Sequence, residues 1–73
     1  MPAPVTPPIT VPRLVHLRVR QALTQDDLAR LAKLDAATIR RLEHGQRHPR
    51  PSTLRKLARA IGVAPDELME IGA

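Results

Sequence analysis

Residues 23–43 read LTQDDLARLAKLDAATIRRLE, and this stretch decides the fold because it predicts two short helices in succession. The first has its N-cap at Thr24, whose hydroxyl can accept a hydrogen bond from the Asp27 N–H in a near capping box. Its inner face is apolar and consists of Leu28, Ala29 and Ala32. We expect this helix to end near Lys33, after about two turns.

A second helix is predicted from Ala36 to about His44, with Asp35 as its N-cap and Gly45 as the residue of positive φ that follows it. Two residues, Ile39 and Leu42, are spaced to point inward. The outward residues are then Ala36, Ala37, Arg40, Arg41 and His44, with Thr38 on the flank. Two short helices joined by a turn of about four residues form the geometry that places a second helix in a DNA major groove.

Outside this pair the sequence predicts three further helices and no strand. One runs from Pro12 to about Ala22 and points leucines inward. Another begins at Pro51 and ends at Gly62, and its apolar residues recur at helical spacing: Leu54, Leu57, Ala58 and Ile61. A short last helix begins at Pro65 and carries Leu68, Met69 and Ile71. The predicted fold class is all-α, a compact five-helix domain containing a helix-turn-helix.

The first 11 residues contain four prolines, which fix φ and remove hydrogen-bond donors. We interpret residues 1–11 as a Pro-rich flexible N-terminal arm and residues 12–73 as one helix-turn-helix domain, with the recognition helix at about 36–44.

Composition limits the function. The chain of 73 residues has no cysteine, which excludes a disulfide or a thiol nucleophile and suits a reducing cytoplasm. It also has no aromatic residue, which excludes the stacking platforms of many single-strand binders. Seven basic residues between positions 40 and 59 stand against Glu43 alone, so the net charge of +5 is concentrated there. Such a block indicates either a polyanionic partner or an ordinary solvated surface, and charge alone leaves both open.

The residues resemble the phage repressor and Cro helix-turn-helix proteins, the XRE family, from about Leu14 to Met69. The similar segments are Leu17-Arg18, residues 23–29, residues 38–43, the turn with Gly45 and Pro49, residues 53–63 and residues 66–68. The resemblance implies base reading by Ala36, Ala37, Arg40 and Arg41. It implies phosphate contacts by Gln25, Thr38, His44, Gln46, Arg47 and Arg50. It also implies a structural ion pair between Arg18 and Glu43.

Three positions depart from the family pattern. Lys33 replaces the usual turn glycine, which implies a positive φ at a non-glycine residue. Asp35 caps the recognition helix where serine or threonine is common. Leu31 replaces a residue that is normally polar, and an exposed leucine could belong to an interface.

The sequence therefore predicts a sequence-specific double-stranded DNA-binding protein, a transcriptional repressor more than an activator. It would act in a prokaryotic cytoplasm or be encoded by a phage. A homodimer through the C-terminal helix (Leu68, Met69, Ile71) is expected, since one recognition helix reads too few base pairs. The alternative is an antitoxin or another protein-interaction module on the same fold.

No nucleophile and base pair, phosphate loop or metal cluster indicates an enzyme or a cofactor. His44 and His48 have the spacing of a helical metal pair, but Gly45 and Pro49 break any helix there and no third ligand is evident. We expect no metal.

Overall fold

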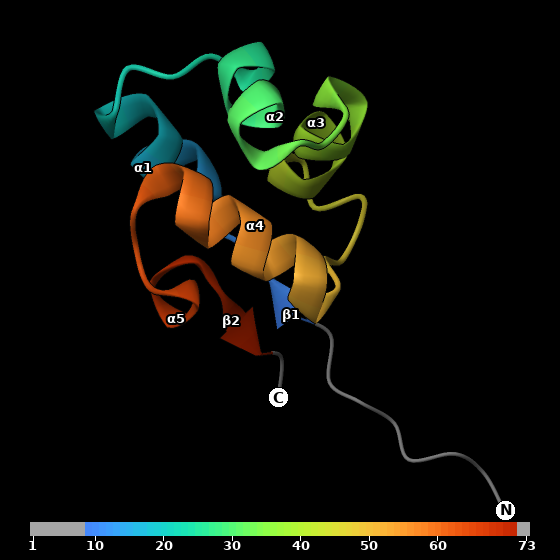
Figure 1. The fold of residues 1–73 in the computed structure, drawn as a ribbon. Helices are drawn as coiled ribbons and strands as arrows, with labels where there is room; N and C mark the ends of the chain where they lie inside the picture. The colour runs from blue at the N-terminus through green and yellow to red at the C-terminus, as the bar shows by residue number, and fades with distance from the viewer. Residues whose placement is uncertain (1–8, 72–73) are drawn as a thin grey trace, which may run out of the picture.

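Five helices follow one another in the computed structural model, which describes residues 9–71 (Figure 1). They are α1 (Leu14–Arg20), α2 (Gln25–Ala32), α3 (Ala36–Glu43), α4 (Pro51–Ile61) and α5 (Pro65–Leu68). The all-α, five-helix fold class predicted from the sequence is confirmed. The longest described helix, α4, has 11 residues, whereas a helix needs about 20 to cross a bilayer.

The start of α2 is fixed locally, as the sequence predicts. The Asp27 N–H donates to the Thr24 hydroxyl over 3.0 Å, and the Thr24 N–H donates to the Asp27 carboxylate over 2.9 Å. The backbone N–H of Thr24 holds the pKa of Asp27 below its ordinary value, with help from the Thr24 hydroxyl and Arg30. Because the folded pKa is lowered, the bond stabilises the fold above the unfolded pKa and is lost as pH falls through the folded pKa.

The start of α3 differs from the prediction. Asp35 occupies the N-cap position, with φ −76° and ψ 143°, but its side chain makes no capping hydrogen bond. The Thr38 N–H, which the carboxylate would have bound, instead donates to the Asp35 carbonyl over 3.0 Å. Asp35 is therefore the N-cap residue by its backbone conformation, as predicted. The prediction that its side chain caps the helix is wrong.

The outer helices are shorter than the sequence predicts. Helix α1 begins at Leu14 rather than at Pro12, and it ends at Arg20 because Ala22 takes φ 57°. Helix α5 ends at Leu68 rather than running on to Ile71. Leu68 is 0% exposed, so it cannot belong to the dimer surface that we expected, and Met69 is partly buried against the core.

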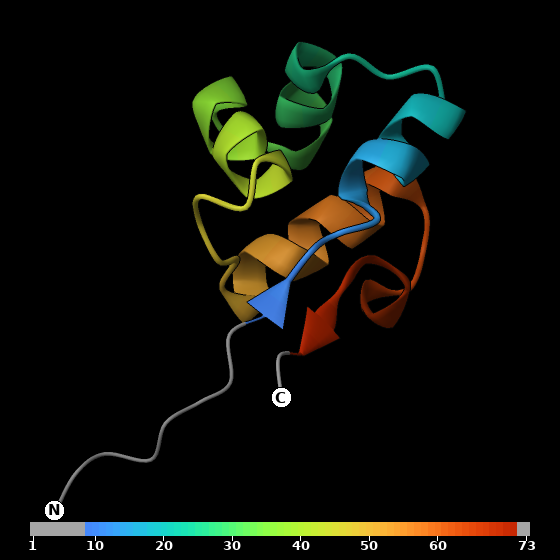
Figure 2. The ribbon, with the colours of Figure 1, turned by 180° about the vertical axis from the view of Figure 1, so that it is seen from behind.

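Two short strands lie where none was predicted. Strand β1 (Ile9–Thr10) pairs antiparallel with β2 (Glu70–Ile71), with Ile9 opposite Ile71, and the two arrows lie side by side when the chain is seen from behind (Figure 2). Val11, which follows β1, is only 5% exposed and belongs to the core. Residues 9–11 are therefore part of the folded domain and not of a flexible arm. The rest of that predicted arm, residues 1–8, lies outside the described residues.

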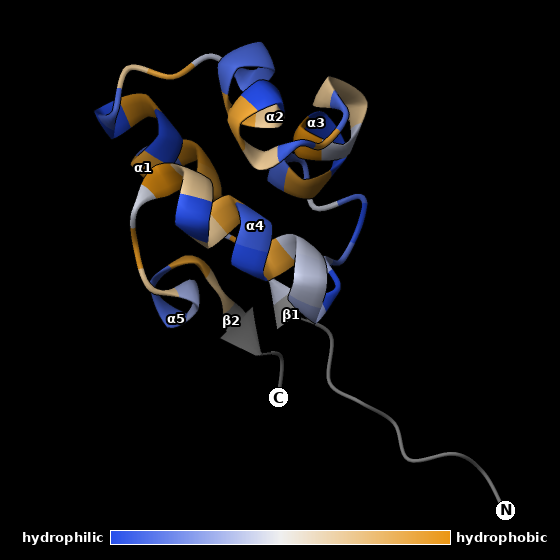
Figure 3. Cartoon of the chain, viewed as in Figure 1, coloured by the Kyte–Doolittle hydropathy of each residue, from blue (hydrophilic) through white to orange (hydrophobic). Residues whose placement is uncertain are grey.

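Every helix contributes to one hydrophobic core. Its largest fully buried side chains are Leu14, Leu28, Ile39, Leu57, Ile61 and Leu68. Helix α4 supplies two of them and crosses the centre of the molecule, with hydrophobic segments along its length (Figure 3). The inward faces predicted for α2, α3 and α4 are confirmed. Because the core holds no aromatic side chain, its stability rests on the close fit of aliphatic groups.

Replacement of Lys33 by glycine should stabilise the domain. Lys33 ends α2 in the left-handed conformation, with φ 57°, which costs a residue with a Cβ roughly 1–2 kcal/mol. The greater entropy of glycine in the unfolded chain cancels about 0.4–1 kcal/mol of that gain. We expect the free energy of unfolding to rise by up to about 1.5 kcal/mol in urea denaturation. Lys33→Ala is the control, because it removes the charge and keeps the Cβ. Equal stability of the two variants would contradict the expectation.

Candidate DNA interface

Helices α2 and α3 pack against each other across a short turn (Figure 1). The turn begins at Lys33 and is closed by the Leu34 N–H, which donates to the Ala29 carbonyl over 2.8 Å. Ala29 and Ala32 are buried on α2, at 5% and 4% exposure, and their small side chains leave room for close packing. This arrangement is the helix-turn-helix that the sequence predicts.

The phase of α3 is set by its two buried residues. Ile39 is 0% and Leu42 is 3% exposed, which turns Arg40 and Arg41 to the surface. The predicted contact residues at the start of the helix are less accessible than expected. Ala36 and Ala37, predicted to read bases, and Thr38, predicted to contact phosphate, are all half-buried, and Ala36 packs against the core. The exposed part of α3 is therefore dominated by two arginines that follow a patch of small residues.

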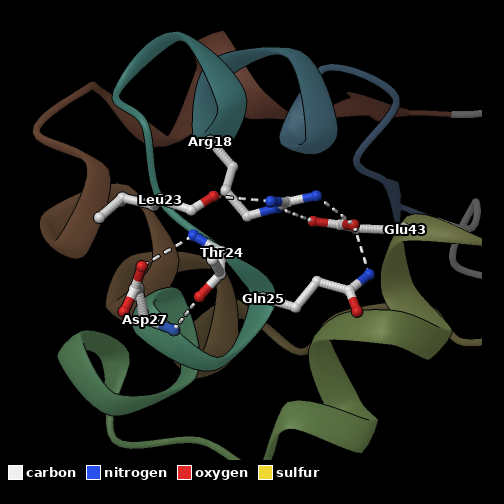
Figure 4. A network of polar contacts seen from close by, with 6 residues as sticks. All are labelled: Arg18, Leu23, Thr24, Gln25, Asp27 and Glu43. Carbon is white, nitrogen blue, oxygen red and sulfur yellow. Dashed lines mark hydrogen bonds and ion pairs between the residues drawn. The ribbon is translucent and has the colours of Figure 1, made fainter.

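A buried polar network holds α3 in place (Figure 4). Nε of Arg18 on α1 donates to Glu43 Oε2 over 2.6 Å, and its Nη2 donates to Oε1 over 3.1 Å. The remaining terminal nitrogen of Arg18 donates to the Leu23 carbonyl over 2.7 Å. The two side chains are 12% and 3% exposed, so this bidentate pair is largely removed from water. It contains the ion pair that the family resemblance implied.

Gln25 completes the network from the first turn of α2. Its side-chain Nε2 donates to Glu43 Oε1 over 2.9 Å. The carboxylate of Glu43 thus accepts three hydrogen bonds, from α1 and from α2, at the last residue of α3. The family resemblance implied a phosphate contact for Gln25, and that contact stays a prediction. What the structure shows is the contact with Glu43, which braces α3.

The loop after α3 presents the other predicted phosphate-binding residues. Its polar residues His44, Gln46, Arg47 and Arg50 are all exposed. Gly45 takes φ 70°, and the Gln46 N–H donates back to the Arg41 carbonyl over 2.8 Å, so the loop leaves α3 in a tight turn. Pro49 is buried at its far end. The loop is therefore anchored at both ends while its basic side chains face water.

The N-terminal segment lies against the same loop. Thr10, Val11 and Pro12 line a hollow of about 180 Å³ together with Arg47 and His48. Sequence reasoning missed this contact, because Val11 precedes Pro12 in a proline-rich segment that is too short to carry a periodic signal. The segment that precedes α1 thus borders the candidate interface.

The electrostatics of this surface favour an anionic partner. Within residues 9–71, the exposed guanidinium groups of Arg40, Arg41, Arg47 and Arg50 have no ion pair. Glu43, which carries the single negative charge between positions 40 and 59, is already bound to Arg18. The positive charge of α3 and its loop is therefore not compensated by the described part of the protein.

Comparisons with known proteins agree with this geometry. A family model described as helix-turn-helix matches residues 15–68. Two proteins of Bacillus subtilis (strain 168) are similar over 58 residues: the HTH-type transcriptional repressor RghR, 41% identical, and the uncharacterized HTH-type transcriptional regulator RghRB, 38% identical. The matches cover 78% of this chain, but 43% and 42% of the two relatives, so the chain spans less than half of their length.

Two solved structures share the fold. The restriction-modification controller protein C.AhdI from Aeromonas hydrophila has a TM-score of 0.74 and 38% identity, over 75% of this chain and 83% of that one. The hypothetical transcription factor NHTF from Neisseria has a TM-score of 0.73 and 29% identity, over 75% of this chain and 62% of that one.

Glu43→Gln should destabilise the fold by about 2 kcal/mol, because it leaves the Arg18 guanidinium largely buried without its countercharge. Chemical denaturation monitored by circular dichroism measures this loss. Asp66→Asn is the control, since Asp66 is exposed and has no ion pair within the described part of the chain. Adding Arg18→Met to the Glu43→Gln variant should recover part of the loss. A loss no larger than that of Asp66→Asn would show that the charge of Glu43 does not contribute to the stability of the fold.

Proposed function

Because the chain belongs to the helix-turn-helix family of the XRE type, we propose that it is a sequence-specific double-stranded DNA-binding protein that represses transcription. Its family and its similarity to transcriptional regulators support DNA-binding regulation as the general role. The observation that carries the specific proposal is the pair Arg40 and Arg41, exposed on α3 with no acidic partner among residues 9–71. An anchored helix that presents free guanidinium groups fits the major groove.

We propose that α3 lies in the major groove and that its arginines read base edges. Arg41 would donate two hydrogen bonds to a guanine, and Arg40 would contact a neighbouring base. The small side chains of Ala36 and Ala37 let the start of α3 approach the floor of the groove. The network of Arg18, Gln25 and Glu43 fixes the angle at which these residues enter.

Phosphate contacts would position the domain on the duplex. The proposed groups are the exposed loop residues His44, Gln46, Arg47 and Arg50, together with Gln25 and Thr38 at the starts of α2 and α3. Contacts of this kind set register and affinity but carry no sequence information. Mutations in α3 and mutations in the loop should therefore affect binding in different ways.

We also propose that the protein binds as a homodimer on a two-fold operator in the cytoplasm. One recognition helix reads too few base pairs for useful specificity, and two half-sites about one helical turn apart supply the rest. Since Leu68 is buried, the proposed contact lies at Met69 and the strand β2 that follows it. Saturation at two chains per operator-length duplex in sedimentation experiments would support the dimer, and saturation at one chain would exclude it.

Binding to duplex DNA should depend steeply on salt. Several lysine or arginine contacts to phosphate per protomer release condensed counterions, so a dimer should lose roughly a thousandfold in affinity between about 50 mM and about 200 mM salt. Fluorescence anisotropy with an operator selected from a random duplex pool measures this slope. An affinity that does not change with salt would refute the proposal.

Arg41→Ala and Arg47→Ala should have different effects. Loss of a bidentate contact to guanine costs about 1–3 kcal/mol at one base position, so Arg41→Ala should relax the sequence preference there. Arg47 lies in the loop, and its replacement should weaken all sequences alike and reduce the salt slope by about one. Selection of bound sequences with each variant distinguishes the two. An unchanged sequence preference for Arg41→Ala would remove Arg41 from the base-reading set.

A further inference from the structure

A second surface feature lies between α2 and α4, two helices that pack against each other (Figure 1). Here the protein has a groove of about 490 Å³, lined by Leu31, Ala32, Lys33, Lys56, Arg59 and Ala60. We call it the Leu31 groove. None of its lining residues belongs to α3 or to the loop that follows α3, so it is separate from the proposed DNA interface.

The groove has an apolar wall that the fold leaves uncovered. Leu31 is 55% exposed although its neighbour Ala32 is buried at 4%. On α4, the core takes Leu57, Ala58 and Ile61. Lys56 and Arg59, three residues apart, are exposed on the outer side of α4, and Ala60 beside them is half-buried against the edge of the core. The hydrophilic segments that interrupt the hydrophobic ones along α4 are visible in Figure 3.

The rim of the groove is positively charged without compensation. Lys33, Lys56 and Arg59 have neither an ion pair nor a side-chain hydrogen bond to any residue in the range 9–71. The carboxylates of Asp27 and Glu43 are bound to Arg30 and Arg18, away from this rim. Three free cations around an exposed leucine complement a ligand that is both anionic and apolar.

Two other occupants fit less well. DNA phosphates would satisfy the three cations, but they offer nothing to Leu31 and Ala60. A second copy of the chain could supply Asp66 and Glu67 from the region of α5. In that copy the leucine that follows these carboxylates, Leu68, is buried in the core, so it cannot lie against Leu31.

We propose that the Leu31 groove binds an acidic segment of a partner protein. An apolar side chain of that segment lies between Leu31 and Ala60, and flanking carboxylates pair with Lys33, Lys56 and Arg59. A partner bound there occupies a surface distinct from α3, so the protein can bind it and DNA together. This inference does not depend on the proposed DNA-binding function.

Selection from a random library of about 12-residue displayed peptides against the whole immobilised chain tests the proposal. We expect the enriched peptides to carry aspartate or glutamate on both sides of an aliphatic or aromatic residue. Their affinity should fall at least about tenfold for Leu31→Ser and for the double variant Lys56→Glu/Arg59→Glu. The matched controls are Val19→Ser, another exposed apolar residue on a helix, and Arg20→Glu/Arg55→Glu, which changes the net charge equally outside the groove. These controls should bind as the parent does.

The proposal is overturned by no enrichment above the starting library, by enriched peptides that are not acidic, or by equal binding to groove and control variants. A different result would assign the cations to DNA instead. In that case Lys56→Glu/Arg59→Glu loses DNA affinity, Arg20→Glu/Arg55→Glu keeps it, and Leu31→Ser has no effect on any ligand. Self-association abolished by Leu31→Ser would assign the groove to a second copy. If a variant fails to fold, the amide chemical shifts of the unmodified chain are measured with the enriched peptide. They must change at Leu31, Lys33, Lys56 and Ala60. Changes only at other residues would refute the site.

Discussion

The ion pair between Arg18 and Glu43 joins the last residue of α3 to α1, and through Gln25 to the start of α2. A carboxylate that is 3% exposed is costly to bury, and the three hydrogen bonds it accepts are what make its burial tolerable. These bonds have defined directions, unlike the contacts of an aliphatic core. The orientation of α3 therefore depends on this pair as well as on the burial of Ile39 and Leu42.

The same pair shapes the surface charge. Glu43 would otherwise place a negative charge beside Arg40, Arg41 and Arg47, and its bond to Arg18 confines that charge to the interior. What remains on α3 and its loop is positive and exposed. The outer side of α4 is also positive, but there the cations surround Leu31. The two surfaces have the same sign of charge and differ in apolar content, and this difference is why we assign them different partners.

The sequence by itself determined the features that depend on a few neighbouring residues. The capping box of Thr24 and Asp27, Pro51 at the start of α4, and the positive φ of Gly45 all follow from contacts within one turn of the chain, whereas the positive φ of Lys33 was implied by the family resemblance. The buried faces of α2, α3 and α4 follow from a period of 3.6 residues, which a linear sequence displays directly. For these reasons the helix-turn-helix and the outward arginines of α3 could be predicted.

Only the tertiary structure decided what depends on distant segments. The strands β1 and β2 come from opposite ends of the described chain and are too short to show an alternating pattern, so neither they nor the burial of Val11 could be predicted. The length of α5 follows from the same pairing and packing. The hydrogen bond from Gln25 to Glu43 joins two different helices. The groove that Leu31 lines together with Lys56 and Arg59 also lies between two helices. Local propensity does not encode such contacts, because they exist only once the helices have packed.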